Sequence, residues 1–189
     1  RDSHIWLTDL AQPPYGSSGD ELMPLTELPI PGLHNLENAL AVILASRAVG
    51  AEPAQIVSGL KSFTGVEHRI ELCHTRADGV RFYNDSKATN LDAMKRAVVA
   101  FNQPIVLIAG GRDAHSDYSS ITHLIKQHVS HLVTLGEAAP LIEEAWGHIV
   151  PTCRAATMQK AVSIANDLAT PGSVVVFSPA CKSFDIYRN

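Results

Sequence analysis

Residues 82–90, FYNDSKATN, place an acid, a lysine and two hydroxyl side chains directly after a hydrophobic stretch. Asp85, Lys87 and Thr89 stand at alternate positions, and a stretch with helical spacing follows. The first N–H groups of a helix lack partners and carry the positive end of its dipole, and Thr89 or Asn90 is a suitable cap. With the charge of Lys87 beside them, this corner predicts a site for a carboxylate or phosphate. A simple helix cap beside a surface Asp85–Lys87 ion pair explains the same spacing equally well.

Two further polar stretches follow continuous apolar runs. GGRDAHSD follows IVLIA and combines two glycines with charged side chains and His115. Because neither G-x-x-x-x-G-K-[ST] nor G-x-G-x-x-G occurs in the chain, we interpret this stretch as a flexible turn between strand and helix. SPACKSF follows SVVVF and contains Cys181, Lys182 and Ser183. A small packed cysteine is favoured over a nucleophile, and the lysine and hydroxyls are candidates for a second part of an anion pocket.

Composition argues against several classes of function. The three cysteines are widely spaced and form no C-x-x-C pair, which argues against a zinc site and a disulfide scaffold and fits a reducing cytoplasm. The nine histidines lack H-E-x-x-H spacing, so no metal site is predicted in this chain. A formal charge of -4 gives no positive field for nucleic acid or an anionic membrane surface. No apolar run reaches the roughly 18 residues of a membrane span.

The elements that must position the polar loops alternate regularly from about residue 68. RIELCHT and VRFYN flank ADG, which predicts a β-hairpin. Strands expected at 105–109, 131–135, 149–153 and 173–178 alternate with helices expected at 90–101, 119–129, 139–146 and 157–169. Several of these strands are continuous apolar runs, typical of a parallel sheet covered on both faces. We therefore predict a doubly wound, mostly parallel, Rossmann-like α/β domain over 68–189, with ligands bound at the strand-to-helix loops.

Residues 1–67 show a different pattern. PPYGSSGD between HIWL and ELMPLTEL predicts a hairpin or sheet edge, and helices are expected at 34–50 and 52–63. Gly50 supplies a stop for the first helix, and Pro53 fits the first turn of the second. This short α+β part looks like the tail of a domain whose main body lies upstream. The abrupt end at IYRN also suggests a piece of a longer protein.

Five segments together resemble the Mur ligases of peptidoglycan synthesis: HNLENALA, GVEHRIE, GVRFYNDSKATN, IVLIAGGRD and VVVFSPACKSFD. The resemblance runs from roughly residue 20 to the end and implies an ATP-dependent, amide-forming ligase of three domains. Residues 1–67 would then be a remnant of the central ATPase domain, and 68–189 most of the C-terminal domain. Within the family, NDSKATN and SPAC-x-SFD favour addition of D-glutamate to UDP-N-acetylmuramoyl-L-alanine through an acyl phosphate. Mg²⁺ offsets the phosphate charge in such reactions.

The resemblance also implies roles for single residues near ATP. Asn38 of HNLENA matches the family residue that meets the adenine, while Arg69 and Asp85 match residues near the nucleotide. An acid that accepts from ribose hydroxyls and an arginine that holds phosphate suit these roles. The phosphate-binding loop and the magnesium ligands of the family have no counterpart here, and we expect them upstream.

Three residues match the D-glutamate and reaction site of the family, namely Lys87, Thr89 and Ser183. Lys87 is the candidate catalytic residue. The chain departs from the family at Ala114, where many relatives have a lysine that binds D-glutamate, and at Lys182, where a small residue is usual. We hypothesise that Lys182 or His115 supplies the missing positive charge.

Two alternatives to this ligase remain open. One is a related enzyme with another acceptor, such as a different Mur ligase or a folylpolyglutamate synthase, although NDSKATN argues against it. The other is a non-catalytic α/β module that holds an anionic ligand or a partner protein. We expect the whole enzyme to be a cytoplasmic monomer that serves cell-wall synthesis, cell shape and cell division. We expect this part alone to be inactive and to self-associate through the apolar residues of 36–49.

Overall fold

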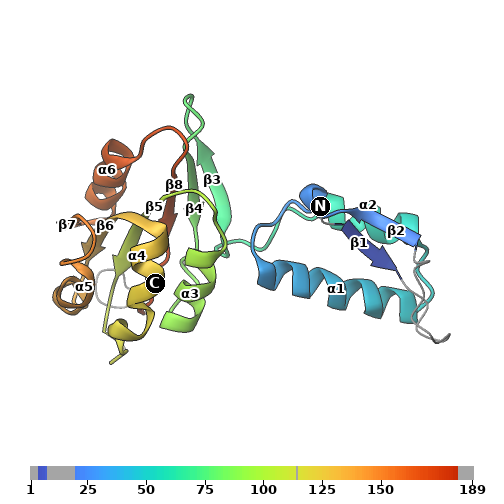
Figure 1. Ribbon diagram of the computed structural model, residues 1–189, viewed down its shortest axis with the longest axis horizontal. Helices are drawn as coiled ribbons and strands as arrows, with labels where there is room; N and C mark the ends of the chain where they lie inside the picture. Colours follow the sequence, from blue (N-terminus) through green and yellow to red (C-terminus); the bar gives the residue numbers. More distant parts are fainter. Residues whose placement is uncertain (1–3, 8–19, 114, 183–189) are drawn as a thin grey trace. The chain divides into compact units, whose positions relative to one another are not determined.

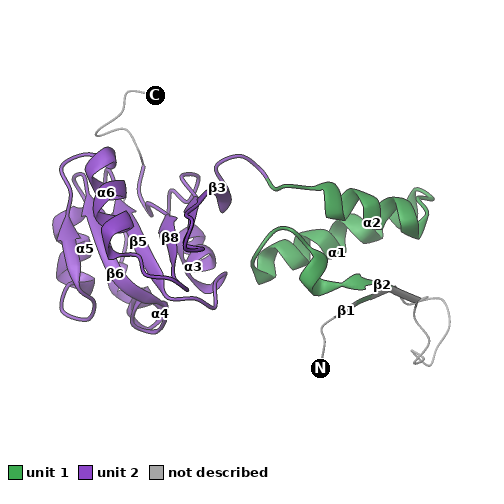
Figure 2. Cartoon of the chain, turned by 90° about the horizontal axis from the view of Figure 1, so that it is seen from above, with its two compact units in different colours: residues 1–65 green, residues 66–189 purple. Residues whose placement is uncertain are grey.

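The computed structural model describes residues 4–7, 20–113 and 115–182 (Figure 1). The chain divides into two compact units, residues 1–65 and 66–189 (Figure 2). The boundary predicted after residue 67 lies two residues past this division. Each unit has its own hydrophobic core.

The first unit is a small α+β structure. Its elements are the antiparallel strands β1 (His4–Leu7) and β2 (Asp20–Pro24), a 3-10 turn η1 (Leu25–Glu27), and the helices α1 (Leu33–Ala48) and α2 (Pro53–Ser62). Gly50 follows the end of α1 with φ 86°, and Pro53 opens α2, so both predicted helices are confirmed. A reciprocal cap between Glu52 and Gln55 satisfies N–H groups at the start of α2.

Helix α1 carries apolar side chains on its exposed sides as well as on its buried one. Ala39 and Ile43 are buried in the core of the unit. Leu40 and Leu44 are exposed at 41% and 61%, and Val49, the residue directly after the helix, at 84%. A helix that is apolar all round is usually covered on more than one side, and exposed apolar patches favour association. The self-association expected from this stretch stays a prediction.

The second unit contains a six-stranded sheet in the order β3-β4-β8-β5-β6-β7. Its strands are β3 (Glu71–Thr75), β4 (Arg81–Asn84), β5 (Ile105–Gly110), β6 (Val129–Leu135), β7 (Thr152–Arg154) and β8 (Val174–Phe177). β3 and β4 form the predicted hairpin, and the other neighbouring strands run parallel. The prediction of a mostly parallel sheet with an N-terminal hairpin is confirmed.

Helices cover the two faces of the sheet unequally (Figure 1). α3 (Leu91–Val99), α4 (Thr122–His128) with its leading turn η2 (Tyr118–Ile121), and α5 (Ala139–Trp146) pack on one face, and α6 (Met158–Leu168) on the other. Alternate residues of β5 supply both cores: Leu107 points to the three-helix face and Ile108 to the α6 face. This double burial explains the continuous apolar runs.

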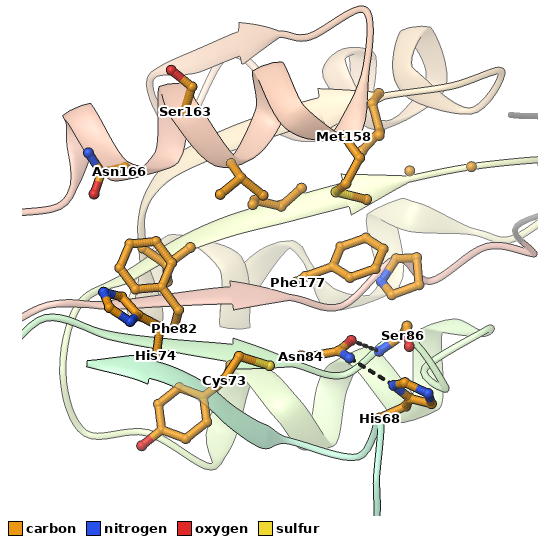
Figure 3. A pocket seen from close by; sticks show the side chains of 18 residues that line it. His68, Cys73, His74, Phe82, Asn84, Ser86, Met158, Ser163, Asn166 and Phe177 are labelled. Atoms are coloured by element: carbon orange, nitrogen blue, oxygen red, sulfur yellow. Dashed lines mark hydrogen bonds between the residues drawn. The ribbon is translucent and has the colours of Figure 1, made fainter. Parts of the chain in front are cut away.

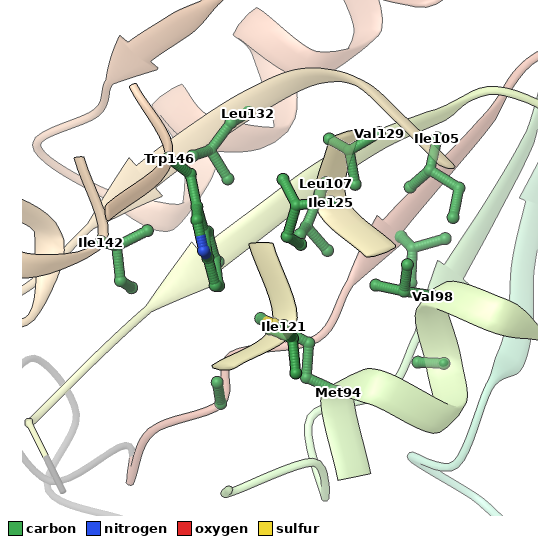
Figure 4. Close-up of a cluster of buried hydrophobic side chains, with 14 of the residues drawn as sticks. Met94, Val98, Ile105, Leu107, Ile121, Ile125, Val129, Leu132, Ile142 and Trp146 are labelled. Carbon is green, nitrogen blue, oxygen red and sulfur yellow. The ribbon is translucent and has the colours of Figure 1, made fainter. Parts of the chain in front are cut away.

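The larger core lies between the sheet and α3, α4 and α5 (Figure 4). Trp146 of α5, Met94 of α3 and Ile125 of α4 are fully buried there. The Trp146 indole N–H donates to the carbonyl of Tyr118 at 3.0 Å, so the core also fixes the start of η2. The polar loops therefore stand on a rigid, densely packed base.

Candidate active site

The loops that follow β4, β5 and β8 meet at the carboxyl edge of the sheet. The turn after β8, residues 178–182, lies between the other two loops. On one side the Ala180 N–H donates to the Ala88 carbonyl at 2.9 Å, and on the other the Arg112 N–H donates to the Lys182 carbonyl at 2.8 Å. The strand order β4-β8-β5 produces this arrangement, because strands far apart in the sequence are neighbours in the sheet.

Two glycines allow the loop after β5 to approach its neighbours. A Cβ on Gly110 would lie 2.0 Å from the Leu135 carbonyl oxygen, and one on Gly111 would lie 2.6 Å from that of Lys182. Their φ angles of 124° and 144° are also unfavourable for other residues. The glycines thus serve close backbone packing, and the interpretation of GGRDAHSD as merely a flexible turn is wrong for its first two residues.

Asp85, at the start of the NDSKATN loop, is buried. Its carboxylate accepts from the Ile70 N–H at 3.2 Å and from the Ser178 hydroxyl at 3.0 Å. Burial raises the pKa of Asp85 to about 6, although these two hydrogen bonds and the charge of Arg69 oppose the rise. Asp85 makes no ion pair with Lys87, so the alternative of a surface Asp85–Lys87 pair is wrong.

The pKa of Asp85 implies a pH-dependent stability. The folded-state pKa of about 6 lies above the value of about 3.9 for a free aspartate. Protonated Asp85 therefore makes its full contribution to stability below a pH of about 3.9. This contribution is lost as the pH rises through about 6. In the Asp85→Asn variant, residue 85 cannot titrate. The free energy of unfolding of the variant relative to wild type should therefore be about 1–2 kcal/mol higher at pH 7.5 than at pH 4.5. Urea unfolding at both pH values measures this difference.

Asp92→Asn is the matched control, since Asp92 is an exposed carboxylate in the first turn of α3. Its difference from wild type should change little between the two pH values. The buried position of Asp85 predicts a pH-dependent difference between Asp85→Asn and wild type. An equally constant difference in the free energy of unfolding would contradict this prediction.

Lys87 and Thr89 are exposed beyond Asp85 on the same loop. No carboxylate within the described part of the chain lies at ion-pair distance from Lys87. The cap of α3 is Asn90, whose side chain accepts from the Ala93 N–H at 2.9 Å. Of the two capping candidates, Asn90 is therefore the one used, and Thr89 keeps an exposed hydroxyl beside the helix N-terminus.

Arg69 is exposed between two residues with unusual backbone conformations. His68 has φ 67° and the β-branched Ile70 has φ 45°. Residues other than glycine rarely adopt such positive φ angles. Hydrogen bonds hold the strained segment: the Lys87 N–H donates to the His68 carbonyl at 3.2 Å, and the Ile70 N–H donates to Asp85. Such strain is typical of functional sites. Arg69 was predicted from the sequence but His68 was not, because no local pattern signals the positive φ.

His115 and Cys181 lie on the other two loops. The His115 ring nitrogen Nδ1 is 3.2 Å from a carboxylate oxygen of Asp113, and the side chain is 96% exposed. Cys181 is fully buried, which confirms the prediction of a packed cysteine. Lys182 is exposed at the last described position of its turn.

The remaining predicted site residues lie elsewhere. Asn38 is exposed on α1, in the first unit. Ser183 and Ala114 fall outside the described residues. The structure thus brings Arg69, Asp85, Lys87 and Thr89 together with Lys182 at one edge of the second unit. The predicted parallel sheet was sufficient to place Asp85, Lys87, Thr89 and Lys182 at a common edge, but not to predict their contacts or the position of Arg69.

A pocket of about 1000 Å³ opens between α6 and the sheet (Figure 3). Its apolar lining includes Met158 of α6, Phe82 of β4 and Phe177 of β8, and it reaches Gly111 at the carboxyl edge. Near this edge the Asn84 amide lies 2.9 Å from the His68 ring and accepts from the Ser86 N–H at 3.0 Å. The pocket was not predictable from the sequence, because it depends on how much of the sheet α6 covers.

The described residues offer neither a cluster of metal ligands nor a membrane-spanning helix. No group of three or more His, Cys, Asp or Glu side chains in residues 4–7, 20–113 and 115–182 is arranged to hold a metal ion. Within the same ranges, no helix has the length and apolar character needed to span a bilayer.

Two solved ligase structures are similar in fold to this chain. A pseudomurein peptide ligase type C from Methanothermus fervidus superposes with a TM-score of 0.65 at 13% identity, covering 95% of this chain and 38% of that one. The UDP-N-acetylmuramate-alanine ligase MurC from Thermotoga maritima gives 0.63 at 18% identity, covering 80% and 35%. At these identities the similarity establishes the fold alone.

Sequence comparison defines the family. Residues 68–181 match the model described as Mur ligase, glutamate ligase domain, and the chain therefore belongs to the Mur ligase family. Among its relatives are the UDP-N-acetylmuramoylalanine–D-glutamate ligases of Syntrophus aciditrophicus, 43% identical over 174 residues, and Salinibacter ruber, 46% identical over 171 residues. The alignments cover 92% and 90% of this chain, but 38% and 37% of the relatives, so the chain spans less than half of their length.

Proposed function

We propose that the chain is part of an ATP-dependent ligase that joins D-glutamate to UDP-N-acetylmuramoyl-L-alanine. The observation that carries this proposal is the 40–46% identity to D-glutamate ligases over about 90% of the chain. The convergence of the NDSKATN, GGRD and SPACK loops at one edge supports it. The carboxylate of the first substrate accepts a phosphoryl group from ATP, and the amine of D-glutamate then displaces phosphate from the acyl phosphate.

The residues near Asp85 are proposed to bind ATP. Arg69 presents an exposed guanidinium on a strained segment, which suits a phosphate. Asp85 has a free lone pair on each carboxylate oxygen for a ribose hydroxyl, besides the hydrogen bonds it accepts from Ile70 and Ser178. Asn38 of the first unit is proposed to meet the adenine. Mg²⁺ offsets the phosphate charge when bound, and we place its ligands in parts of the whole protein outside this chain.

D-glutamate and the reacting groups are proposed to lie against Lys87, Thr89, Ser183 and Lys182. An exposed lysine without an acidic partner in the described residues is suited to attract a carboxylate or the transferring phosphoryl group. His115 is the weaker candidate for a substrate cation because Asp113 already faces its ring. We therefore propose that Lys182 supplies the positive charge for the D-glutamate carboxylate, which Ala114 cannot supply.

Lys182→Ala tests this assignment in the whole enzyme. The KM for D-glutamate should rise at least about tenfold while the KM for ATP changes less than twofold, since only one substrate loses a charge-assisted contact. His115→Ala is the companion variant and should change both values less than threefold. Equal effects of Lys182→Ala on the two substrates would remove Lys182 from the D-glutamate site.

The function itself is tested with the whole protein and a panel of amino acids. ATP-dependent turnover with UDP-N-acetylmuramoyl-L-alanine and D-glutamate alone supports the proposal. Turnover with another amino acid, or with a folate, identifies a related ligase, an alternative that the shared fold keeps open. Absence of any ATP-dependent turnover favours a non-catalytic module that binds an anion or a partner.

The proposed reaction places the whole protein in peptidoglycan precursor synthesis, and through it in cell shape and cell division. We propose that it acts in the cytoplasm as a monomer, and that the 189 residues alone are inactive because they span 37–38% of the relatives' length. The exposed apolar residues of α1 are proposed to self-associate when this part is isolated.

A further inference from the structure

Tyr118, the first residue of η2, joins the hydrophobic core to the loops above it. Tyr118 is 5% exposed, and its ring packs edge-on against Trp146, with ring centroids 5.8 Å apart at 89°. The Trp146 indole also donates to the Tyr118 carbonyl at 3.0 Å. Both the ring and the backbone of Tyr118 are therefore fixed by the core, which leaves the position of its hydroxyl well defined.

The Tyr118 hydroxyl lies where the GGRD loop meets the turn after β8. It donates to the Asp113 carboxylate at 3.2 Å and lies 3.2 Å from the Cys181 sulfur. Burial, together with Cys181 and Asp113, raises the pKa of Tyr118, so the hydroxyl keeps its proton and remains a donor. With its single proton directed to Asp113, the oxygen is available to accept from the Cys181 thiol.

The two loops that this hydroxyl connects are also in close backbone contact. The Arg112 N–H donates to the Lys182 carbonyl at 2.8 Å, and a Cβ on Gly111 would lie 3.2 Å from Cys181 Cβ. Asp113 is thereby held between the Tyr118 hydroxyl on one side and the His115 ring on the other. Arg112 and Lys182, the residues next to Asp113 and Cys181, are exposed.

We propose that Tyr118 is a positioning residue for the amino-acid substrate: through Asp113 and Cys181 it holds the two loops in one register and so presents Lys182 toward the substrate carboxylate. This inference rests on the proposed ligase function and extends it to a residue that does not touch substrate.

Tyr118→Phe in the whole enzyme removes the hydroxyl and keeps the ring. The KM for D-glutamate should rise about tenfold, while the KM for ATP should stay within twofold. Adding Asp113→Asn should produce little further change, because both substitutions break the same link. Ser173→Ala is the matched control: it removes another buried hydroxyl, which bonds Thr170 before β8 begins, at the opposite end of that strand. It should leave both KM values unchanged.

Thiol labelling tests the same link in the 189-residue chain. In a Cys73→Ser, Cys153→Ser background, which removes the two exposed cysteines, the labelling rate of buried Cys181 reports opening of the loop pair. Tyr118→Phe should raise this rate at least about tenfold, and Ser173→Ala should not.

Faster labelling together with a selective rise in the KM for D-glutamate supports the proposal. An unchanged labelling rate, or equal changes in the KM for D-glutamate and ATP, overturns it. A wild-type whole protein that shows no turnover with D-glutamate instead contradicts the proposed function, and the labelling experiment still decides whether Tyr118 holds the loops.

Discussion

Lys87→Ala is expected to lower the kcat of the whole ligase by about a hundredfold or more. Lys87 is exposed at the carboxyl edge, beside the positive N-terminus of α3, and lies opposite the turn that contains Lys182. In the proposed reaction, a cation in this place would stabilise the negative charge that develops as the phosphoryl group moves and the acyl phosphate forms. Loss of one such electrostatic contact typically costs two to three powers of ten in rate. Steady-state kinetics with each substrate varied in turn measures the effect.

The effect of Lys87→Ala should be confined to catalysis. The side chain has no ion-pair partner in the described residues, so its removal should leave the free energy of unfolding within about 0.5 kcal/mol of wild type. Lys95→Ala, an exposed lysine on α3, is the matched control and should retain wild-type kcat. A kcat for Lys87→Ala within threefold of that control would show that Lys87 takes no part in the reaction.

The chain order of the elements was predictable because its signals are local. Asp-Gly in the hairpin turn, apolar runs of strand length and helical spacing between them all act over a few residues. The covered sheet then requires the loops to share one edge. For this reason the sequence alone predicts that Asp85, Lys87 and Lys182 lie at one edge of the sheet.

The environment of each site residue depends on distant parts of the chain and was not predictable. Asp85 is buried, and its carboxylate is satisfied by the hydroxyl of Ser178, 93 positions away, and by the Ile70 N–H. Spacing alone is equally consistent with a surface pair between Asp85 and Lys87. His115 likewise looked like an available cation until the structure showed Asp113 beside it. The cap of α3 was also not decided by the sequence. Thr89 and Asn90 are both suitable residues, and only Asn90 caps the helix.

Gly110→Ala should have the largest effect on stability, about 4 kcal/mol or more. Gly110 ends β5 at φ 124°, and its N–H donates to the Pro179 carbonyl at 3.0 Å. A Cβ there would lie 2.0 Å from the carbonyl oxygen of Leu135, which belongs to the backbone of β6. Alanine therefore has an unfavourable φ, and it also forces two central strands apart at their carboxyl ends.

Gly172→Ala separates the cost of the unfavourable φ from the cost of the steric clash with β6. Gly172 has φ 87°, but a Cβ at this position would meet nothing within 4 Å, so only the conformational cost of about 1 kcal/mol remains. Urea unfolding of the 189-residue chain compares the two variants directly. A difference of less than about 1 kcal/mol between them would mean that β5 and β6 do not approach as closely as the structure shows. A difference of several kcal/mol would show that close backbone contact between β5 and β6 positions the GGRD loop. Only glycine at position 110 permits that contact.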